Sequence, residues 1–312
     1  GAYNPHSQYR VRLLAWAGEK TADETLGALI MRRIRDARAV RAALALPSAH
    51  TSAYRLLNSE GDRCSGLTVD CFHDAGDPSQ CTVAVASAAC WTEVRRAEIC
   101  GAIQDALAPA RICWRQSRAA LALDGWTLFT DETHAAPRVI VSEHGVRYVT
   151  EPGGGQKTGF YCDQRENRLL VRQLARGRRV LDAYCYTGGF ALNAAAGGAI
   201  SVHAVDSSEP ALALARENAA LNPSTLITFE HADVRAVLAR AGSYDLMVLD
   251  PPKLAGTRSQ VPRAVKLYRA LCADALRRLT PQGLLLVCSC SSAIGAEELA
   301  HALRDAGMDA AR

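Results

Sequence analysis

From Val180 onward, the sequence alternates continuous apolar segments with amphipathic helical segments. The apolar segments predict five strands, over residues 178–184, 199–206, 226–233, 244–250 and 283–291. Helices are predicted between them, for example over residues 263–279 and 208–221, the latter with Ser207 or Ser208 as N-cap and Pro210 in the first turn. Continuous apolar strands that alternate with helices form a parallel sheet with helices on both faces. The fold class predicted for this region is therefore α/β.

An aspartate stands at the predicted carboxyl end of four successive strands, as Asp182, Asp206, Asp233 and Asp250. One such aspartate is readily explained as a helix N-cap. Four carboxylates at one edge of a sheet repel each other, which favours a polar ligand at this edge, where parallel sheets bind their ligands. Asp206 follows Asp182 by 24 residues, a spacing that suits an acid bonded to ribose hydroxyls.

The segment AYCYTGGF joins the first strand to a helix that Gly188 and Gly189 open. It lacks the G-x-G-x-x-G pattern of dinucleotide sites, and the nearby GQKTG lacks the G-K-[ST] order of a phosphate loop. A ligand with ribose and adenine but no pyrophosphate fits these residues better than a dinucleotide. S-adenosylmethionine is therefore the predicted cofactor.

The first half of the chain predicts a smaller, mixed α+β region. YRVRLLAW, over residues 9–16, predicts one half-buried strand, and a helix is predicted over residues 21–44. Short strands follow, over residues 53–58, 66–72, 81–87 and 111–115, with a helix near residues 92–107 and a hairpin over 139–150 that turns at His144 and Gly145. No catalytic arrangement is recognisable there from spacing alone.

Charge and cysteine content exclude some classes of protein. The net charge of +4 does not by itself indicate a nucleic-acid partner, but basic runs over residues 165–179 and 253–278 are candidates for contacts with phosphates. The 11 cysteines include no C-x-x-C, which fits neither a disulfide framework nor a zinc site, so no metal is expected. No apolar run reaches the ~18 residues of a membrane span.

Several long motifs together carry a family resemblance: GGGQKTGFYCDQRENR, VLDAYCYTGGFAL, DPPK and the S-C-S tripeptide at residues 289–291. Over nearly its whole length the chain resembles the RlmI-type class I S-adenosylmethionine-dependent methyltransferases, which form 5-methylcytosine in large-subunit rRNA. Ser59 and Ser65 replace a glycine and a proline usual in that family. The resemblance implies the closing strand of a truncated PUA domain over residues 1–17, a central RNA-side α+β domain over 18–150, and a C-terminally truncated Rossmann-like methyltransferase domain over 151–312.

The resemblance also implies site residues. Phe160 and Arg165 would line the cofactor, with the guanidinium on its carboxylate. The methionine part would lie among Asp182, Tyr186, Gly188 and Gly189, the ribose at Asp206, and the adenine at Asp233 and Val234. Asp250 would touch both the cofactor and the target base, and the RNA would be contacted by Lys157, Lys253 and Arg258.

Carbon 5 of cytosine needs a nucleophile on carbon 6 before it can accept a methyl group, and a cysteine thiolate suits this task. Cys288 and Cys290 lie two residues apart on the predicted fifth strand, hence on one face, and Cys290 is the one that reaches the carboxyl end. The family's catalytic cysteine is the one in S-C-S, which also selects Cys290. Asp250 would hold the N3/N4 edge of the base. The proton acceptor at carbon 5 is not identified.

Two other functions stay open at this point. Relatives with D-P-P-T in place of DPPK, and without the S-C-S cysteine, methylate a guanine without covalent attack. An RNA-binding or ribosome-assembly relative without catalysis is the second alternative. A cytoplasmic location is expected, or an organellar one if a targeting segment has been removed before Gly1, and a homodimer is an open alternative to a monomer.

Overall fold

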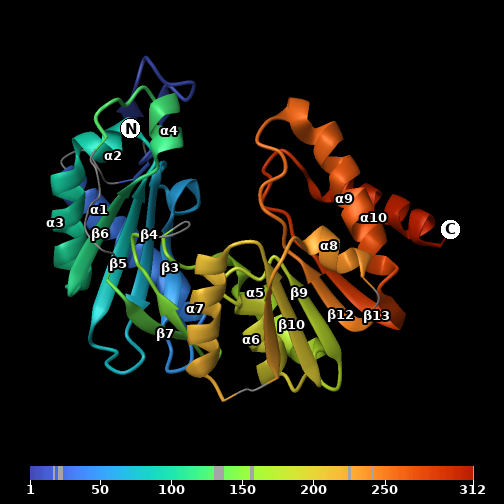
Figure 1. Cartoon of the computed structure of the whole chain (residues 1–312). Coiled ribbons are helices and arrows are strands. Elements are labelled where there is room, and N and C mark those ends of the chain that lie inside the picture. Colours follow the sequence, from blue (N-terminus) through green and yellow to red (C-terminus); the bar gives the residue numbers. More distant parts are fainter. Residues whose placement is uncertain are drawn as a thin grey trace. The chain divides into compact units, whose positions relative to one another are not determined.

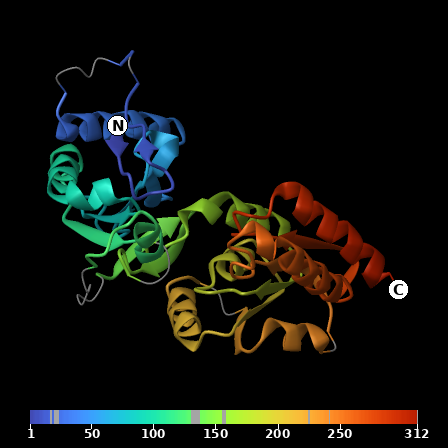
Figure 2. The same ribbon diagram turned by 90° about the horizontal axis from the view of Figure 1, so that it is seen from above.

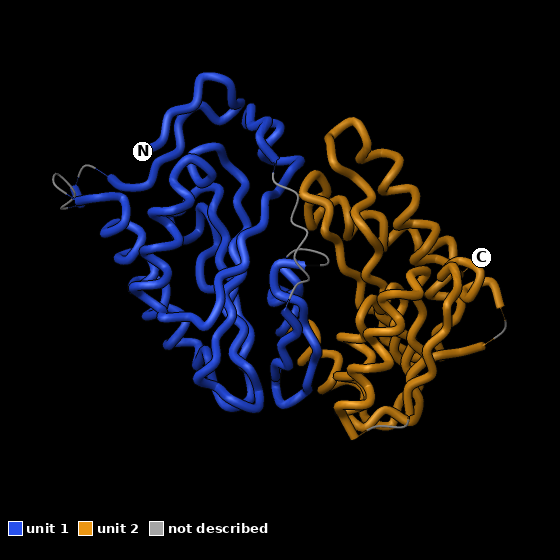
Figure 3. The backbone as a smooth tube through the Cα atoms, turned by 60° about the vertical axis from the view of Figure 1, so that its left-hand side comes forward, with its two compact units in different colours: residues 1–165 blue, residues 166–312 orange. Residues whose placement is uncertain are grey.

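The computed structural model describes residues 1–16, 18–19, 24–129, 137–154, 158–223, 226–240 and 242–311. They form two compact units, Gly1–Arg165 and Glu166–Arg312 (Figure 3). The sequence-based domain boundaries after residues 17 and 150 stay predictions. No helix within the described ranges is long and apolar enough to cross a membrane.

The first unit is built on a four-stranded sheet in the order β3-β4-β5-β6 (Figure 1). These strands are Ala53–Asn58, Leu67–His73, Cys81–Ser87 and Arg111–Gln116, and only the β5–β6 pair is parallel. Helices α1 (Leu26–Ala43) and α3 (Arg96–Leu107) contribute to one hydrophobic core with this sheet. The short helices are η1 (Ser59–Asp62), α2 (Cys90–Val94), α4 (Arg118–Leu123) and η2 (Cys162–Gln164). The mixed α+β prediction is therefore confirmed.

Some predicted elements change their limits. The helix predicted from residue 21 begins at Leu26, because the Thr25 hydroxyl caps it by accepting the Ala28 N–H at 3.2 Å; residues 20–23 lie outside the described ranges. The helix predicted near 92–107 is interrupted at Arg95. The hairpin of β7 (Val139–Glu143) and β8 (Val146–Thr150) turns at His144 and Gly145, as predicted, with positive φ at both residues.

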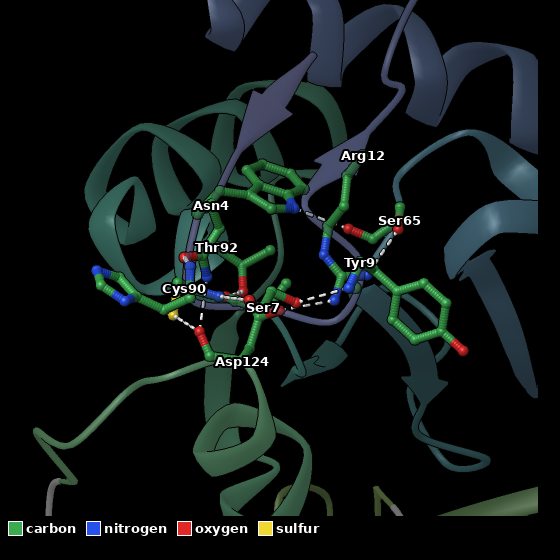
Figure 4. A network of polar contacts seen from close by, with 12 residues as sticks. Asn4, Ser7, Tyr9, Arg12, Ser65, Cys90, Thr92 and Asp124 are labelled. Carbon is green, nitrogen blue, oxygen red and sulfur yellow. Dashed lines mark hydrogen bonds and ion pairs between the residues drawn. The ribbon is translucent and has the colours of Figure 1, made fainter.

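The N-terminal segment differs from its prediction. A strand over residues 9–16 was expected, but only β2 (Val11–Arg12) is extended and paired, with β1 (Ala2–Tyr3) as its antiparallel partner. Buried Asp124 connects this segment to the rest of the first unit. Its carboxylate accepts a hydrogen bond from Arg12 of the segment at 3.0 Å and another from the Cys90 N–H at 2.7 Å (Figure 4). Burial opposes ionisation of this carboxyl, but hydrogen bonds from Ser7, Cys90 and Arg12 outweigh it and lower the pKa of Asp124. Polar contacts rather than a long strand therefore fix this segment.

The second unit confirms the predicted parallel sheet. Five strands, all parallel, lie in the order β11-β10-β9-β12-β13 (Figure 1). In chain order they are β9 (Arg179–Ala183), β10 (Ser201–Asp206), β11 (Ile227–His231), β12 (Tyr244–Leu249) and β13 (Leu279–Val287). The helices are α5 (Arg165–Leu174), α6 (Gly189–Ala196), α7 (Glu209–Ala220), α8 (Val234–Ala239), η3 (Arg258–Gln260), α9 (Val261–Leu276) and α10 (Ala296–Ala310).

Side-chain alternation along the strands buries both faces of this sheet. Val180 and Val248 belong to one core with residues of α5, α6 and α7. Their neighbours Leu181 and Met247 belong to a second core with residues of α8, α9 and α10. Helix α10 packs along α9 (Figure 2). Chain order reverses direction between β9 and β12, and a sheet of this kind binds ligands at the carboxyl ends beside that reversal.

Candidate active site

The segment between β9 and α6 has an unusual backbone. Tyr184 and Tyr186 have φ of 65° and 50°, and Gly188, the N-cap of α6, has φ of 82°. Left-handed conformations cost energy in residues with side chains and are found preferentially at functional sites. The Asp206 carboxylate at the end of β10 holds this segment by accepting the Tyr186 N–H at 2.8 Å. The predicted glycine-opened helix is confirmed, and two strained tyrosines precede it.

Asp182 is a buried carboxyl with a strongly perturbed pKa. It is the penultimate residue of β9 rather than its end, and it is fully buried. Oδ2 accepts the Ala191 N–H at 2.8 Å, and Oδ1 is buried without a hydrogen-bond partner within the described ranges. Burial raises the pKa of Asp182 to about 7, the Ala191 hydrogen bond opposes this, and the negative charges of Asp250 and Asp206 add to it. An unpaired buried acceptor near two other carboxylates suits a cationic group of a ligand.

Backbone N–H groups use part of the hydrogen-bonding capacity of Asp233 and Asp206. Asp233 is the N-cap of α8 and accepts the Arg235 N–H at 2.7 Å, whereas Asp206 accepts the Ser208 N–H at 2.8 Å in the turn before α7. Val234, the first residue of α8, is buried. A carboxylate has about four acceptor positions, so these backbone contacts leave capacity for ribose or adenine contacts.

The start of α6 leaves little space beside its backbone. A Cβ atom on Gly189 would lie 3.1 Å from Cδ of Arg168, and one on Gly188 would lie 3.4 Å from the Cβ of Ala215. Arg168 is itself buried in α5. Sequence reasoning did not single out Arg168, although it ends the DQRENR motif.

Cys290 and Asp250 follow the adjacent strands β13 and β12. β13 ends at Val287, so the prediction that both cysteines lie on this strand, and therefore on one face, is wrong. The two thiols differ in exposure, since Cys288 is buried and Cys290 is exposed, and the choice of Cys290 as the catalytic cysteine stays a prediction. The Cys290 thiol lies 3.9 Å from the Pro251 carbonyl oxygen. The structure thus brings an accessible thiol to the segment that follows Asp250.

The hydroxyl of Ser291 joins these two segments. It is buried and accepts the N–H groups of Leu254 at 3.0 Å and Ala255 at 3.1 Å. Tyr268, fully buried in α9, has its hydroxyl near Ser289 and Ser291, but within the described ranges this hydroxyl makes no hydrogen bond. Burial raises the pKa of Tyr268, and the Cys290 thiol and the Asp250 charge also raise it, whereas the two serine hydroxyls act to lower it. Sequence reasoning missed Ser291 and Tyr268, because only folding brings α9 to the S-C-S segment.

Three predicted site residues are not among the described residues of the second unit. Phe160 is buried in the first unit, with its ring centroid 5.2 Å from that of Tyr148. Arg165 is the last residue of that unit and the first of α5. Lys157 lies outside the described residues. Their contacts with cofactor and RNA stay predictions.

The two basic runs are not wholly available to RNA. Arg179 pairs with Asp245 at 3.1 Å at the amino ends of β9 and β12, opposite the aspartate-bearing edge. Arg269 pairs with Asp309 at 2.6 Å and so joins α9 to α10. The expectation that both whole runs border the site is therefore wrong, whereas Lys253 and Arg258 are exposed. In the described part of the chain, no group of three metal-ligating side chains is placed to hold an ion.

Comparison with known proteins gives a consistent family assignment. A family model described as S-adenosylmethionine-dependent methyltransferase matches residues 129–308. Ribosomal RNA large subunit methyltransferase I of Tolumonas auensis is 35% identical over the whole chain and 78% of its own length. The protein of the same name from Salmonella arizonae is 34% identical, over the whole chain and 77% of its length.

Solved structures support the fold. A SAM-dependent methyltransferase from Streptococcus mutans superposes with a TM-score of 0.75 over 91% of this chain and 72% of its own, at 22% identity. The chain belongs to the family of S-adenosylmethionine-dependent methyltransferases that includes ribosomal RNA large subunit methyltransferase I.

Proposed function

We propose that this protein methylates carbon 5 of a cytosine in large-subunit rRNA, through a covalent bond between Cys290 and carbon 6 of that base. The observation that carries the proposal is the exposed thiol of Cys290 beside the Asp250–Pro251 segment, at the ligand-binding edge of the sheet. The names of the curated relatives support rRNA as the substrate. Methylation of guanine needs no nucleophilic thiol at this place, so Cys290 favours cytosine.

The residues around the β9–α6 segment suit S-adenosylmethionine, which supplies an electrophilic methyl group when bound. The unpaired Oδ1 of Asp182 would face the positive charge of its methionine part. Asp206 would accept hydrogen bonds from the ribose, and Asp233 with Val234 would hold the adenine. Phe160 and Arg165 complete the proposed set.

Cys290 acts as the nucleophile in this proposal. Its thiolate forms a bond to carbon 6, which moves electron density to carbon 5 and makes that carbon able to accept the methyl group. Loss of the carbon-5 proton then restores the ring as the carbon–sulfur bond breaks and the thiolate leaves. Asp250 would bond the N3/N4 edge of the base and favour its protonation while the bond to sulfur exists.

Ser291 would keep the two reacting segments in register. Its hydroxyl oxygen accepts the N–H groups of Leu254 and Ala255, and its own N–H donates to the Ser289 hydroxyl at 3.3 Å. A positioning role follows for Ser291, because it is adjacent to Cys290 in the chain and binds the segment that follows Asp250.

RNA would be held partly by Lys253 and Arg258, the exposed cations of the segment that follows Asp250. The target base must be unpaired or flipped to reach a thiol at the sheet edge. A cytoplasmic location and a homodimer stay predictions.

A tritium-transfer assay on rRNA tests the proposal. Cys290→Ala is expected to abolish labelling of cytosine, whereas the matched Cys288→Ala variant, which removes a buried thiol two residues away, keeps it. Methylation of cytosine by Cys290→Ala at the wild-type rate would contradict the covalent mechanism. Methylated guanine as the product would contradict the choice of base.

A further inference from the structure

One face of the first-unit sheet carries four reactive or aromatic side chains in neighbouring positions. In the register of the sheet, Tyr54 on β3 lies opposite Cys71 on β4, and His73 on β4 lies opposite Cys81 on β5. Cys71 and His73 are two residues apart on one strand and therefore share a face. The rings of Tyr54 and His73 stack with their centroids 6.2 Å apart. None of these residues is used by the proposed methyl transfer.

A cavity of about 390 Å³ reaches this cluster. Its lining includes Tyr54, Cys71, His73 and Cys81 from the sheet, and Arg38 from α1. Cys71 and Cys81 are buried from bulk water, with 1% and 7% of their surfaces exposed. One water molecule takes up roughly 30 Å³ in the liquid, so the cavity has room for water and for a small reactant.

His73 faces Cys81 across the two strands, and its tautomer is set by the loop between them. Its Nδ1 lies 3.1 Å from the Pro78 carbonyl oxygen, and a carbonyl can only accept, so Nδ1 carries a proton. The lone pair of the neutral ring is therefore on Nε2. The neighbouring Cys81 raises the pKa of His73, against the effects of burial and of the Arg38 charge. His73 is thus a base whose free nitrogen is fixed by an orienting acceptor, in the strand position opposite a thiol that lines the same cavity.

The two thiols of the cluster differ in position. Cys81 lies opposite His73 in the sheet register and is the more exposed of the two, whereas Cys71 lies opposite Tyr54 and is almost completely buried. The same difference appears in their ionisation, because the neighbouring Cys71 and His73 lower the pKa of Cys81 against the effect of burial, whereas Cys81 and burial raise the pKa of Cys71. Cys81 is therefore the thiol on which His73 can act as a base.

We propose that Cys81 is a modification site, at which small peroxides oxidise the thiolate with His73 as the acid–base partner. The sulfur attacks one peroxide oxygen, so an S–O bond forms while the O–O bond breaks. With hydrogen peroxide, the leaving hydroxide takes a proton from the His73 imidazolium and becomes water. Sulfur is oxidised to a sulfenic acid, and the peroxide is reduced.

The register also predicts the fate of this product. Cys71 lies opposite Val83, so Cys71 and Cys81 are diagonal neighbours. The Cα atoms of such neighbours are about 7–8 Å apart, whereas most disulfides need about 4.4–6.8 Å. The oxidised form is therefore a sulfenic acid at Cys81, and a Cys71–Cys81 disulfide in peroxide-treated protein would overturn this assignment.

Alkylation of the full chain with iodoacetamide at pH 6.5, followed site by site by peptide mass spectrometry, tests the inference. Cys100 is the internal control, because it is more exposed than Cys81 and burial raises the pKa of its thiol. We expect Cys81 to react about tenfold faster than Cys100, since its larger thiolate fraction outweighs its lower nucleophilicity and access. Brief treatment with hydrogen peroxide should remove this labelling, and dithiothreitol should restore it. Equal rates for the two cysteines, or labelling insensitive to peroxide, would overturn the inference.

A His73 variant shows whether Cys81 reacts because His73 activates its thiol or only because the reagent can reach it. His73→Gln should reduce Cys81 alkylation at pH 6.5 to the rate of Cys100 and restore it at alkaline pH. His50→Gln, at an exposed histidine of the same unit, should leave it unchanged. An unchanged Cys100 rate and circular dichroism spectrum show that the variant is folded. Wild-type reactivity of Cys81 in folded His73→Gln would refute the role of His73.

Discussion

Replacement of Asp182 by asparagine should make the second unit more stable while it weakens cofactor binding. Burial raises the pKa of Asp182 from 3.8 to about 7. An acid with a raised folded-state pKa binds its proton more tightly when folded, so wild-type stability falls as pH rises from about 4 to 7 and stays low above that. A shift of about three pKa units corresponds to about 4 kcal/mol. An asparagine amide with an imperfectly bonded N–H costs about 1–3 kcal/mol, which leaves a gain of about 1–3 kcal/mol at pH 8.

Urea unfolding at pH 4.5, 6 and 8 measures this effect. All four tryptophans, at positions 16, 91, 114 and 126, lie in the first unit, so tryptophan fluorescence follows the unfolding of that unit. The part of the circular dichroism change that fluorescence does not share follows the unfolding of the second unit. The gain of Asp182→Asn should shrink toward pH 4.5. Asp245→Asn is the control of opposite sign, because hydrogen bonds from Arg179 hold the pKa of Asp245 below its usual range. A variant less stable than wild type at pH 8, or a gain independent of pH, would refute the account of Asp182.

Three further outcomes are expected. As the pH is raised toward 7 and Asp182 ionises, the affinity for S-adenosylmethionine should increase by up to about tenfold per pH unit. Calorimetry in two buffers should detect proton release on binding, and an affinity independent of pH counts against the Asp182 contact. Ser291→Ala should lower kcat about tenfold without changing cofactor affinity, because it removes the acceptor of the Leu254 and Ala255 N–H groups beside Cys290, whereas Tyr244→Phe, which removes the hydroxyl that lies 2.8 Å from Nδ1 of His203, should keep kcat; equal effects would refute the positioning role. Charge reversal of Lys253 and Arg258 together should weaken RNA binding and make the slope of log K against log salt shallower by at least about 1.4; an unchanged slope argues against phosphate contacts.

The order of strands and helices in the second unit was predictable because it depends on local pattern. Apolar runs marked all five strands, and the N-cap at Ser208 with Pro210 in the first turn was visible in the sequence. The prediction of a strand over residues 9–16 was wrong because strand pairing is not a local property. The alternation of residues in this segment does not show which partner strand is available. Only Val11–Arg12 finds one.

The chemistry of the site was only partly predictable. Residue types at strand ends indicated the aspartates, but not that Asp182 is buried with one oxygen unpaired. The left-handed φ of Tyr184 and Tyr186 depends on how the β9–α6 segment closes, and no residue type there signals it. Tyr268 lies more than twenty residues from Ser291 in sequence, and only the packing of α9 brings them together.

The central claim is a covalent bond between Cys290 and the target base, and trapping with rRNA that contains 5-fluorocytosine tests it most directly. Fluorine cannot leave as a cation, so the bond to carbon 6 would persist after methyl transfer. We predict a stable protein–RNA complex that requires S-adenosylmethionine, with the RNA attached to the peptide that contains Cys290. Efficient methylation of unmodified rRNA cytosine with no trapped complex, or a complex attached at another residue, would contradict the account.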